Sequence, residues 1–336
     1  MLGFVINPQT HHFEKTGLIY ISTIPSDATV YIDGRLAHQK TPAVLRDLTP
    51  GEHFIRIELE DYNDWEENVP IIARKATVLA NTLMIPEIWP IKAISTQSYQ
   101  NIVAADDGRL VVTNAILKDI GLYDTNSQDP IQNLFSANSI YANGRLIHLY
   151  RATRSPFILL EVRLKDKTKF LWVNVGQKPP LIEDVSDLFP ENPDRILWNN
   201  ADNDNLYAFY PPNIYRINVK DKAIYPQEPQ KLPNNLNEHL TINQNMFLIN
   251  DKNDLLAREN RWIYLYPKTN LGSPQVYNIA KSRPLTNLYF SDNTGELFYL
   301  DESGILSAVQ VLPYHPILDI PIPDALRIKM TSKESK

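Results

Sequence analysis

Aromatic side chains beside prolines form the most distinctive pattern of residues that could bind a ligand. The stretches 198–215 and 262–267 combine several rings with prolines. A rigid aromatic surface of this kind can hold a peptide or a sugar. The same alternation is typical of strands that pack their rings into a core, and both interpretations stay open. The candidate binding residues are Trp198, Tyr207, Tyr210, Tyr215, Trp262 and Tyr264.

Histidines and acidic turns are the candidate metal ligands. The seven histidines include no HExxH or HxH arrangement, and the adjacent His11 and His12 would point to opposite faces of a strand. The acidic segments 106–108 and 202–205 resemble the start of a calcium loop, but the sixth residue of the second is Tyr207 rather than glycine. We therefore predict hairpin turns and no metal or cofactor, with weak calcium binding as the alternative.

Composition excludes several classes of function. The chain has no cysteine and no GxSxG, GxGxxG or Walker-type loop, so neither thiolate catalysis nor phosphate binding by such a loop is indicated. A net charge of -6 gives no basic excess for nucleic acid. No apolar run is long enough to form a membrane-spanning helix. The 25 prolines against 11 glycines favour short strands joined by stiff turns.

Residues 18–85 have the pattern of a small all-β unit. Apolar and charged residues alternate in 55–60, which is the period-two pattern of a half-buried strand. Turn signals at 25–27, 33–34 and 50–51 separate the apolar runs. Asp33-Gly34 can supply the positive φ angles that a two-residue hairpin requires. This spacing predicts a β-sandwich rather than a βαβ unit.

The same region resembles a PEGA domain. Segments 17–25 and 28–34 are similar to the opening of that family, and the following motifs keep its order and spacing: Thr41-Pro42, 48–53 and Tyr62 with Trp65. The naming motif is here Pro25-Ser26-Asp27-Ala28, and Asp61 replaces the usual glycine before Tyr62. Aspartate tolerates left-handed turns, so both departures fit the same fold.

The resemblance implies an extracytoplasmic module. PEGA domains are small β-sandwiches found mainly in exported or surface proteins of bacteria and archaea, with no known active site. Residues 1–14 lack the basic flank and apolar length of a signal peptide. We therefore expect either a membrane anchor upstream of residue 1 or a chain that begins in the cytoplasm.

Residues 92–325 repeat a unit of an apolar strand, a polar turn, a second strand with aromatics, and a third strand. The second strands are predicted at 109–112, 145–149, 205–209 and 296–300, with a weaker copy at 255–256. The units recur about every 35–60 residues, close to the length of a four-stranded propeller blade. The phrase 196–199 before an Asp-rich turn is loosely similar to WD40-like and TolB-like propellers. We predict about five to six blades, with a two-sheet sandwich as the alternative.

The predicted organisation is all-β. It consists of an N-terminal extension (1–14), a PEGA β-sandwich (15–86), a linker (87–91), a β-propeller-like domain (92–325) and a polar tail (326–336).

We expect a non-enzymatic binding or structural module at the cell envelope, outside the cytoplasm. Its partner would be a protein or a surface polysaccharide, bound at one rim of the propeller. One alternative is a carbohydrate-active hydrolase that uses two carboxylates at the propeller channel. The candidate carboxylates are Asp106, Asp184, Asp202 and Asp292. The other alternative is a cytoplasmic interaction scaffold.

Overall fold

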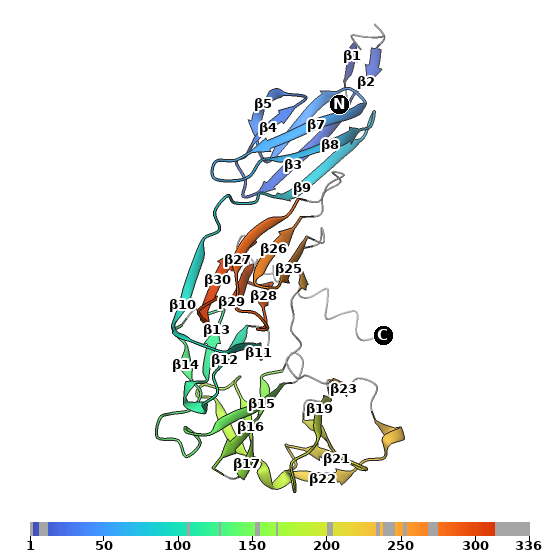
Figure 1. Cartoon of the computed structure of the whole chain (residues 1–336). Coiled ribbons are helices and arrows are strands. Elements are labelled where there is room, and N and C mark those ends of the chain that lie inside the picture. The colour runs from blue at the N-terminus through green and yellow to red at the C-terminus, as the bar shows by residue number, and fades with distance from the viewer. Residues whose placement is uncertain are drawn as a thin grey trace, which may run out of the picture.

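The computed structural model is built from β-strands with three short 3-10 helices among its described residues (Figure 1). It describes residues 3–6, 13–105, 108–127, 129–151, 155–165, 167–199, 204–232, 236–237, 246–250, 254–267 and 275–312. No helix in these ranges is long and apolar enough to cross a membrane. A short hairpin of β1 (Phe4–Ile6) and β2 (Phe13–Lys15) precedes two domains.

The first domain is a sandwich of two sheets. One sheet has the strand order β6-β3-β9 and the other has the order β5-β4-β7-β8. Strand β3 runs parallel to β9 and antiparallel to β6. The strands are β3 (Gly17–Ile24), β4 (Thr29–Ile32), β5 (Arg35–Lys40), β6 (Ala43–Leu48), β7 (Gly51–Glu58), β8 (Trp65–Ile71) and β9 (Ala76–Leu83).

Local sequence signals account for this sandwich. Ile55 and Ile57 on β7 are fully buried while their neighbours are not, so the predicted period-two strand is confirmed. Asp33 and Gly34 both have positive φ, at 48° and 75°, which is the backbone of the predicted two-residue hairpin turn between β4 and β5. Asp61 also takes a positive φ of 67°, as the substitution for glycine requires.

The second domain is a series of antiparallel sheets in chain order. The described residues contain five, with the orders β11-β12-β13-β14, β15-β16-β17-β18, β22-β21-β20-β19-β23, β24-β25-β26-β27 and β10-β30-β29-β28. We call them the first to fifth sheets. The strands of the first two are β11 (Asn101–Ala104), β12 (Arg109–Thr113), β13 (Gly121–Asp124), β14 (Gln132–Asn133), β15 (Arg145–Arg151), β16 (Phe157–Leu164), β17 (Lys167–Asn174) and β18 (Leu181–Asp184).

The third to fifth sheets repeat the meander. Their strands are β19 (Arg195–Asn199), β20 (Asn205–Tyr210), β21 (Asn213–Asn218), β22 (Ala223–Pro226), β23 (Leu236–Asn237), β24 (Met246–Leu248), β25 (Leu255–Glu259), β26 (Trp262–Tyr266), β27 (Tyr277–Lys281), β28 (Tyr289–Ser291), β29 (Glu296–Leu300), β30 (Ile305–Gln310) and β10 (Ile91–Ser98). Most of the segments predicted as second strands are the second strand of the meander in their sheet. The prediction for 145–149 was wrong, because this segment belongs to β15, the first strand of its sheet, and follows turns rather than a strand.

The end of this domain closes onto its beginning. Strand β10 precedes the first sheet in sequence, yet it pairs antiparallel with β30 at the edge of the fifth sheet, with Ile91 opposite Val309. Joining the first and last strands in one sheet is how propellers close their ring. Together with the consecutive antiparallel meanders, this pairing makes the domain propeller-like and confirms the predicted fold class.

Buried clusters hold neighbouring sheets together. Separate clusters join the first sheet to the second, the second to the third, the fourth to the fifth, and the fifth to the first. Within the described ranges, no such cluster joins the third sheet to the fourth. Both faces of an inner strand are covered: on β16, Leu159 packs toward the third sheet and Leu160 toward the first.

The segment between the two domains packs into the second one. Ile85 and Trp89 are only 4% and 8% exposed, and they belong to the cluster of the fourth and fifth sheets. Asn63 also fixes this segment, because its side-chain amide donates hydrogen bonds to the carbonyl oxygens of Ile85 (3.0 Å) and Pro86 (3.3 Å). The segment predicted as a linker therefore carries buried contacts, and its residue 91 already begins β10.

Candidate binding groove

An open groove lies between β5 and β6 of the sandwich. It encloses about 770 Å³, within the range of volumes typical of ligand sites. Among the described strands, each of the two is the edge of its own sheet, since β5 pairs with β4 alone and β6 with β3 alone. The lining mixes apolar and polar side chains, among them Arg35, Leu36, Val44, Leu45, Arg46 and His53.

A buried threonine lies at the corner between the two edge strands. The chain passes from one sheet to the other at Thr41, whose side chain is buried. Its hydroxyl accepts a hydrogen bond from the backbone N–H of Ala28 at 3.0 Å and lies 2.5 Å from the hydroxyl of Thr23. These contacts tie the corner to β3, through Thr23, and to the segment that leads into β4, through Ala28.

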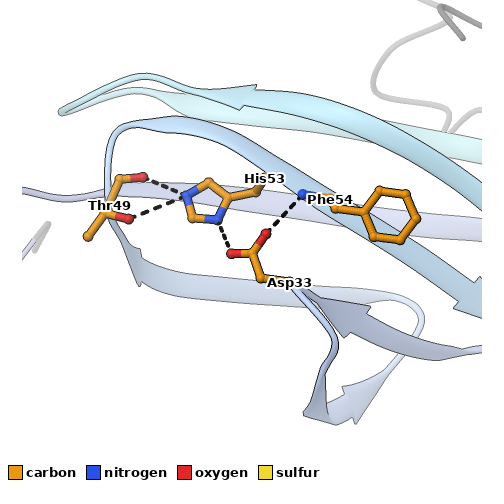
Figure 2. Close-up of polar contacts among 4 residues, drawn as sticks. All are labelled: Asp33, Thr49, His53 and Phe54. Carbon is orange, nitrogen blue, oxygen red and sulfur yellow. Dashed lines mark hydrogen bonds and ion pairs between the residues drawn. The ribbon is translucent and has the colours of Figure 1, made fainter.

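His53 is one of the residues that line the groove, and its ring lies between two oxygen acceptors (Figure 2). Its Nδ1 is 2.7 Å from Oδ2 of Asp33, and its Nε2 is 2.8 Å from the carbonyl oxygen of Thr49. The other carboxylate oxygen of Asp33 accepts the backbone N–H of Phe54 at 3.0 Å. The cluster ties the β4–β5 turn to the segment that leads into β7.

This arrangement has the residue types of a hydroxyl–imidazole–carboxylate catalytic set, but its geometry does not fit that role. A carbonyl oxygen can only accept, so Nε2 of His53 must carry a hydrogen and donate it to Thr49. The Thr49 hydroxyl is farther away, at 3.5 Å. A protonated Nε2 cannot take a proton from that hydroxyl. The cluster positions the walls of the groove instead of activating a nucleophile.

The acidic side chains that line the groove accept hydrogen bonds, whereas its two arginines are not paired with a carboxylate in the described part of the chain. The carboxylate of Asp33 is used by His53 and Phe54, and Asp47 accepts a hydrogen bond from the Thr16 hydroxyl at 3.4 Å. Arg35 and Arg46 are exposed, and neither forms an ion pair with an acidic residue in the described part of the chain. The groove therefore presents two cations without carboxylate partners.

Two of the predicted aromatic binding residues belong to the core. Trp198 is 2% exposed and Tyr207 is 4% exposed, so a ligand on the surface cannot reach their rings. Trp198 stacks on Trp172 with ring centroids 5.0 Å apart, inside the cluster between the second and third sheets. The predicted surface role of these two residues is corrected to packing, because both rings are buried in the third sheet.

The other four aromatic candidates lie nearer the surface, in two separate places. Tyr210 and Tyr215 meet edge-on at 5.7 Å on the third sheet, and burial together with Glu191 raises the pKa of Tyr210 to about 12. Trp262 on the fourth sheet is 36% exposed, with Nζ of Lys281 4.5 Å from its ring, and Tyr264 follows two residues later. The described contacts join neither pair to the other, so the six residues do not form one platform.

The carboxylates of the hydrolase alternative are only partly described. Asp106 and Asp202 lie outside the described residues, while Asp184 and Asp292 are exposed. Desolvation alone would raise the pKa of Asp184, but hydrogen bonds from Ser186 and the contacts of Lys169 and Tyr141 outweigh it and hold that pKa below its ordinary value. Across the described part of the chain, no three histidine or acidic side chains are placed to hold a metal ion.

Comparison with known families identifies the first domain. The sequence model of the PEGA domain family matches residues 16–86. Residues 16–86 are a PEGA domain. The match begins at Thr16, just before β3, and ends at Pro86, which bridges Tyr62 beyond β9. The PEGA assignment made from the motifs is thus confirmed, and no curated protein matches the chain as a whole.

Solved structures similar to the chain include several propellers. The β-propeller domain of Cps50 (Swd1) from Myceliophthora thermophila is 9% identical, over 66% of this chain and 100% of that one, with a TM-score of 0.31. The WD40 propeller of Doa1 is 10% identical over 65% and 96%, with a TM-score of 0.23. A Bacteroides thetaiotaomicron protein of unknown function is 9% identical over 84% and 90%, with a TM-score of 0.33. These scores are low, and the propeller-like assignment rests on the strand order.

One residue of the groove, His53, could have been recognised from the sequence. His53 occupies the same face of β7 as the buried Ile55 and Ile57. A titratable side chain on the core face of an alternating strand needs a hydrogen-bonding partner, which Asp33 provides. Arg35 and Arg46 offer no comparable signal, because exposed arginines on strands are common.

Proposed function

We propose that the chain is a non-enzymatic binding or structural module that works outside the cytoplasm, at the cell surface or envelope. The PEGA domain and the propeller-like domain act as one unit, and the partner is a protein or a surface polysaccharide. The extracytoplasmic location is supported by the PEGA family, whose members are generally found there.

The junction between the domains is the observation that carries this proposal. Trp89 is buried in the cluster of the fourth and fifth sheets, while Asn63 binds the carbonyl oxygens of the same segment from the PEGA side. The backbone N–H of Glu87 also donates to the carbonyl of Asp61 at 2.9 Å. A domain that served only as a flexible tether would not need buried aromatic area and these hydrogen bonds at its exit.

A fixed junction gives the PEGA domain a defined orientation. The β4–β5 hairpin lies at the end of the sandwich away from the propeller-like domain (Figure 1). The groove is therefore presented at one end of the molecule, and the exposed Trp262 lies on the other domain. Two surfaces held at a set distance suit a module that connects partners.

The proposal is tested by site-specific photo-cross-linking in the cells that encode the chain. The photoreactive residue replaces Leu36 in the groove or Trp262 on the fourth sheet, and Ile140, which is 82% exposed, is the control position. We expect adducts from Leu36 or Trp262 in the envelope fraction and none from Ile140. Release of reducing sugar from a polysaccharide panel by the purified chain would contradict the non-enzymatic part. Recovery of the chain only in the cytoplasmic fraction would contradict the location.

A further inference from the structure

We propose that the groove between β5 and β6 binds an acidic peptide in extended conformation, which adds as a strand to the free edge of β5. This inference rests on the proposed binding function and names its partner class. Strand addition to an exposed sheet edge gives affinity through backbone hydrogen bonds and specificity through side-chain pockets.

Backbone geometry leaves hydrogen-bonding groups free at this edge. Ile32 and Arg35 flank the two-residue turn and lie opposite one another, which is the hydrogen-bonded pair of such a hairpin. Because the direction of the backbone groups alternates along a strand, the N–H and C=O of Leu36 point away from β4. No strand in the described part of the chain pairs with β5 on its other side to receive them.

Apolar side chains border the same edge. Leu36 on β5 is 54% exposed and Val44 on β6 is 37% exposed, and both line the groove. An added strand would cover them with alternate side chains of its own, since every second residue of a strand points to the same face. The groove therefore suits a peptide with an apolar residue at every second position.

Charge decides between the possible occupants. The exposed Arg35 of β5 and Arg46 of β6 place one cation on each wall, and the two groove carboxylates, Asp33 and Asp47, already accept hydrogen bonds. A second copy of β5 placed along this edge would bring like charges together, which is destabilising. An acidic strand would give opposite-charge pairs instead. The groove is thus complementary to acidic peptides and selects against self-pairing.

The test uses the full chain and three blocked synthetic peptides of the length of β5. The first alternates valine with glutamate, the second alternates valine with lysine, and the third repeats the first with N-methyl groups on alternate residues. Binding is measured by fluorescence anisotropy, and hydrogen exchange of the β5 peptide reports strand addition. We expect binding of the first peptide alone, with slowed exchange in β5.

A charge-reversal pair supplies the matched control. Arg35→Glu with Arg46→Glu should weaken binding of the acidic peptide by about tenfold and create binding of the lysine peptide. Arg145 and Arg163 are exposed and directly opposite each other on β15 and β16, so Arg145→Glu with Arg163→Glu reverses the same charge without touching the groove. This control should leave the affinity unchanged. Circular dichroism verifies that both variants fold.

The outcomes separate this inference from the broader function. Equal binding of the N-methylated peptide would overturn strand addition, and equal loss in the two charge-reversed variants would overturn the role of Arg35 and Arg46. If cross-links form from Leu36 or Trp262 in cells while no acidic peptide binds, the acidic-peptide inference is wrong and the binding function stands. If neither occurs, both are wrong.

Discussion

The indole rings of Trp172 and Trp198 stack across the boundary between the second and third sheets, with centroids 5.0 Å apart and planes 25° from parallel. Trp172 lies on β17 and Trp198 on β19, so each sheet contributes one ring. Phe157 continues the stack at 5.2 Å from Trp172. The contact makes these aromatics part of what holds neighbouring sheets together.

Truncating this stack should destabilise the propeller-like domain. We expect Trp198→Ala to lower the free energy of unfolding by about 3–5 kcal/mol, because it removes a fully buried indole and leaves a cavity. Trp262→Ala is the control: its ring is 36% exposed and contacts Lys281, so the loss should stay near 1 kcal/mol. Urea denaturation followed by circular dichroism measures both. Equal losses would show that Trp198 is not the packing residue described here.

The case of Trp198 shows where sequence prediction ends. On β7, one face is buried and the other is not, so alternation marks the strand and its buried face directly. On β16, Leu159 and Leu160 are both fully buried because a neighbouring sheet covers each face. Alternation disappears there, and an aromatic residue in such a strand gives no sign of whether it faces solvent or a second sheet.

The features that could not be predicted from the sequence depend on pairing between strands that are far apart in the chain. The turn at Asp33-Gly34 could be predicted because its chemistry is local. The closure of β10 onto β30 joins residues more than two hundred positions apart, and no local pattern in 91–98 encodes it. The groove depends on the same kind of information, since β5 and β6 are exposed edges only because of how their sheets are ordered.

The junction predicts that one residue couples the two domains. Trp89→Ala should remove buried area from the cluster of the fourth and fifth sheets, free the segment 85–91, and make it sensitive to protease. The neighbouring Ile88 is 85% exposed, so Ile88→Ala should leave the protease resistance of the native chain unchanged. Limited proteolysis with mass spectrometry of the fragments measures the difference. Resistance in both variants would mean that Trp89 does not hold the junction.

The contacts of His53 predict that two substitutions of Asp33 destabilise the β4–β5 turn to different extents. Asp33→Ala should destabilise the β4–β5 turn by about 1–3 kcal/mol, because it leaves the ring nitrogen of His53 and the N–H of Phe54 without their acceptor. Alanine also tolerates the positive φ of this position poorly. Asp33→Asn keeps an amide oxygen for Phe54 and accepts the left-handed backbone, so it should cost less. Hydrogen exchange of residues 51–58 measures which substitution destabilises the turn more. A larger effect for Asp33→Asn than for Asp33→Ala would contradict the role given to Asp33.

The contacts of Asp184 predict how the stability of the folded chain changes as the pH falls. Its hydrogen bonds from Ser186 and Tyr141 and its ion pair with Lys169 at 3.0 Å stabilise the ionised form, and its pKa is lowered below the ordinary 3.8. A carboxyl group whose pKa is lower in the folded than in the unfolded chain stabilises the fold at any pH above its unfolded-state pKa. That stabilisation is lost as the pH falls through its folded-state pKa.

The stability difference between the native chain and Asp184→Asn should therefore be about 1 kcal/mol at neutral pH and should shrink as the pH drops below 3.8. Asp292 is the control: it is also exposed, and it forms no ion pair within the part of the chain that the structure describes, so Asp292→Asn should show no such pH-dependent difference. Urea denaturation at a series of pH values measures both variants. A difference for Asp184→Asn that stays constant from neutral to acidic pH would show that the carboxylate is stabilised by packing rather than by its charge.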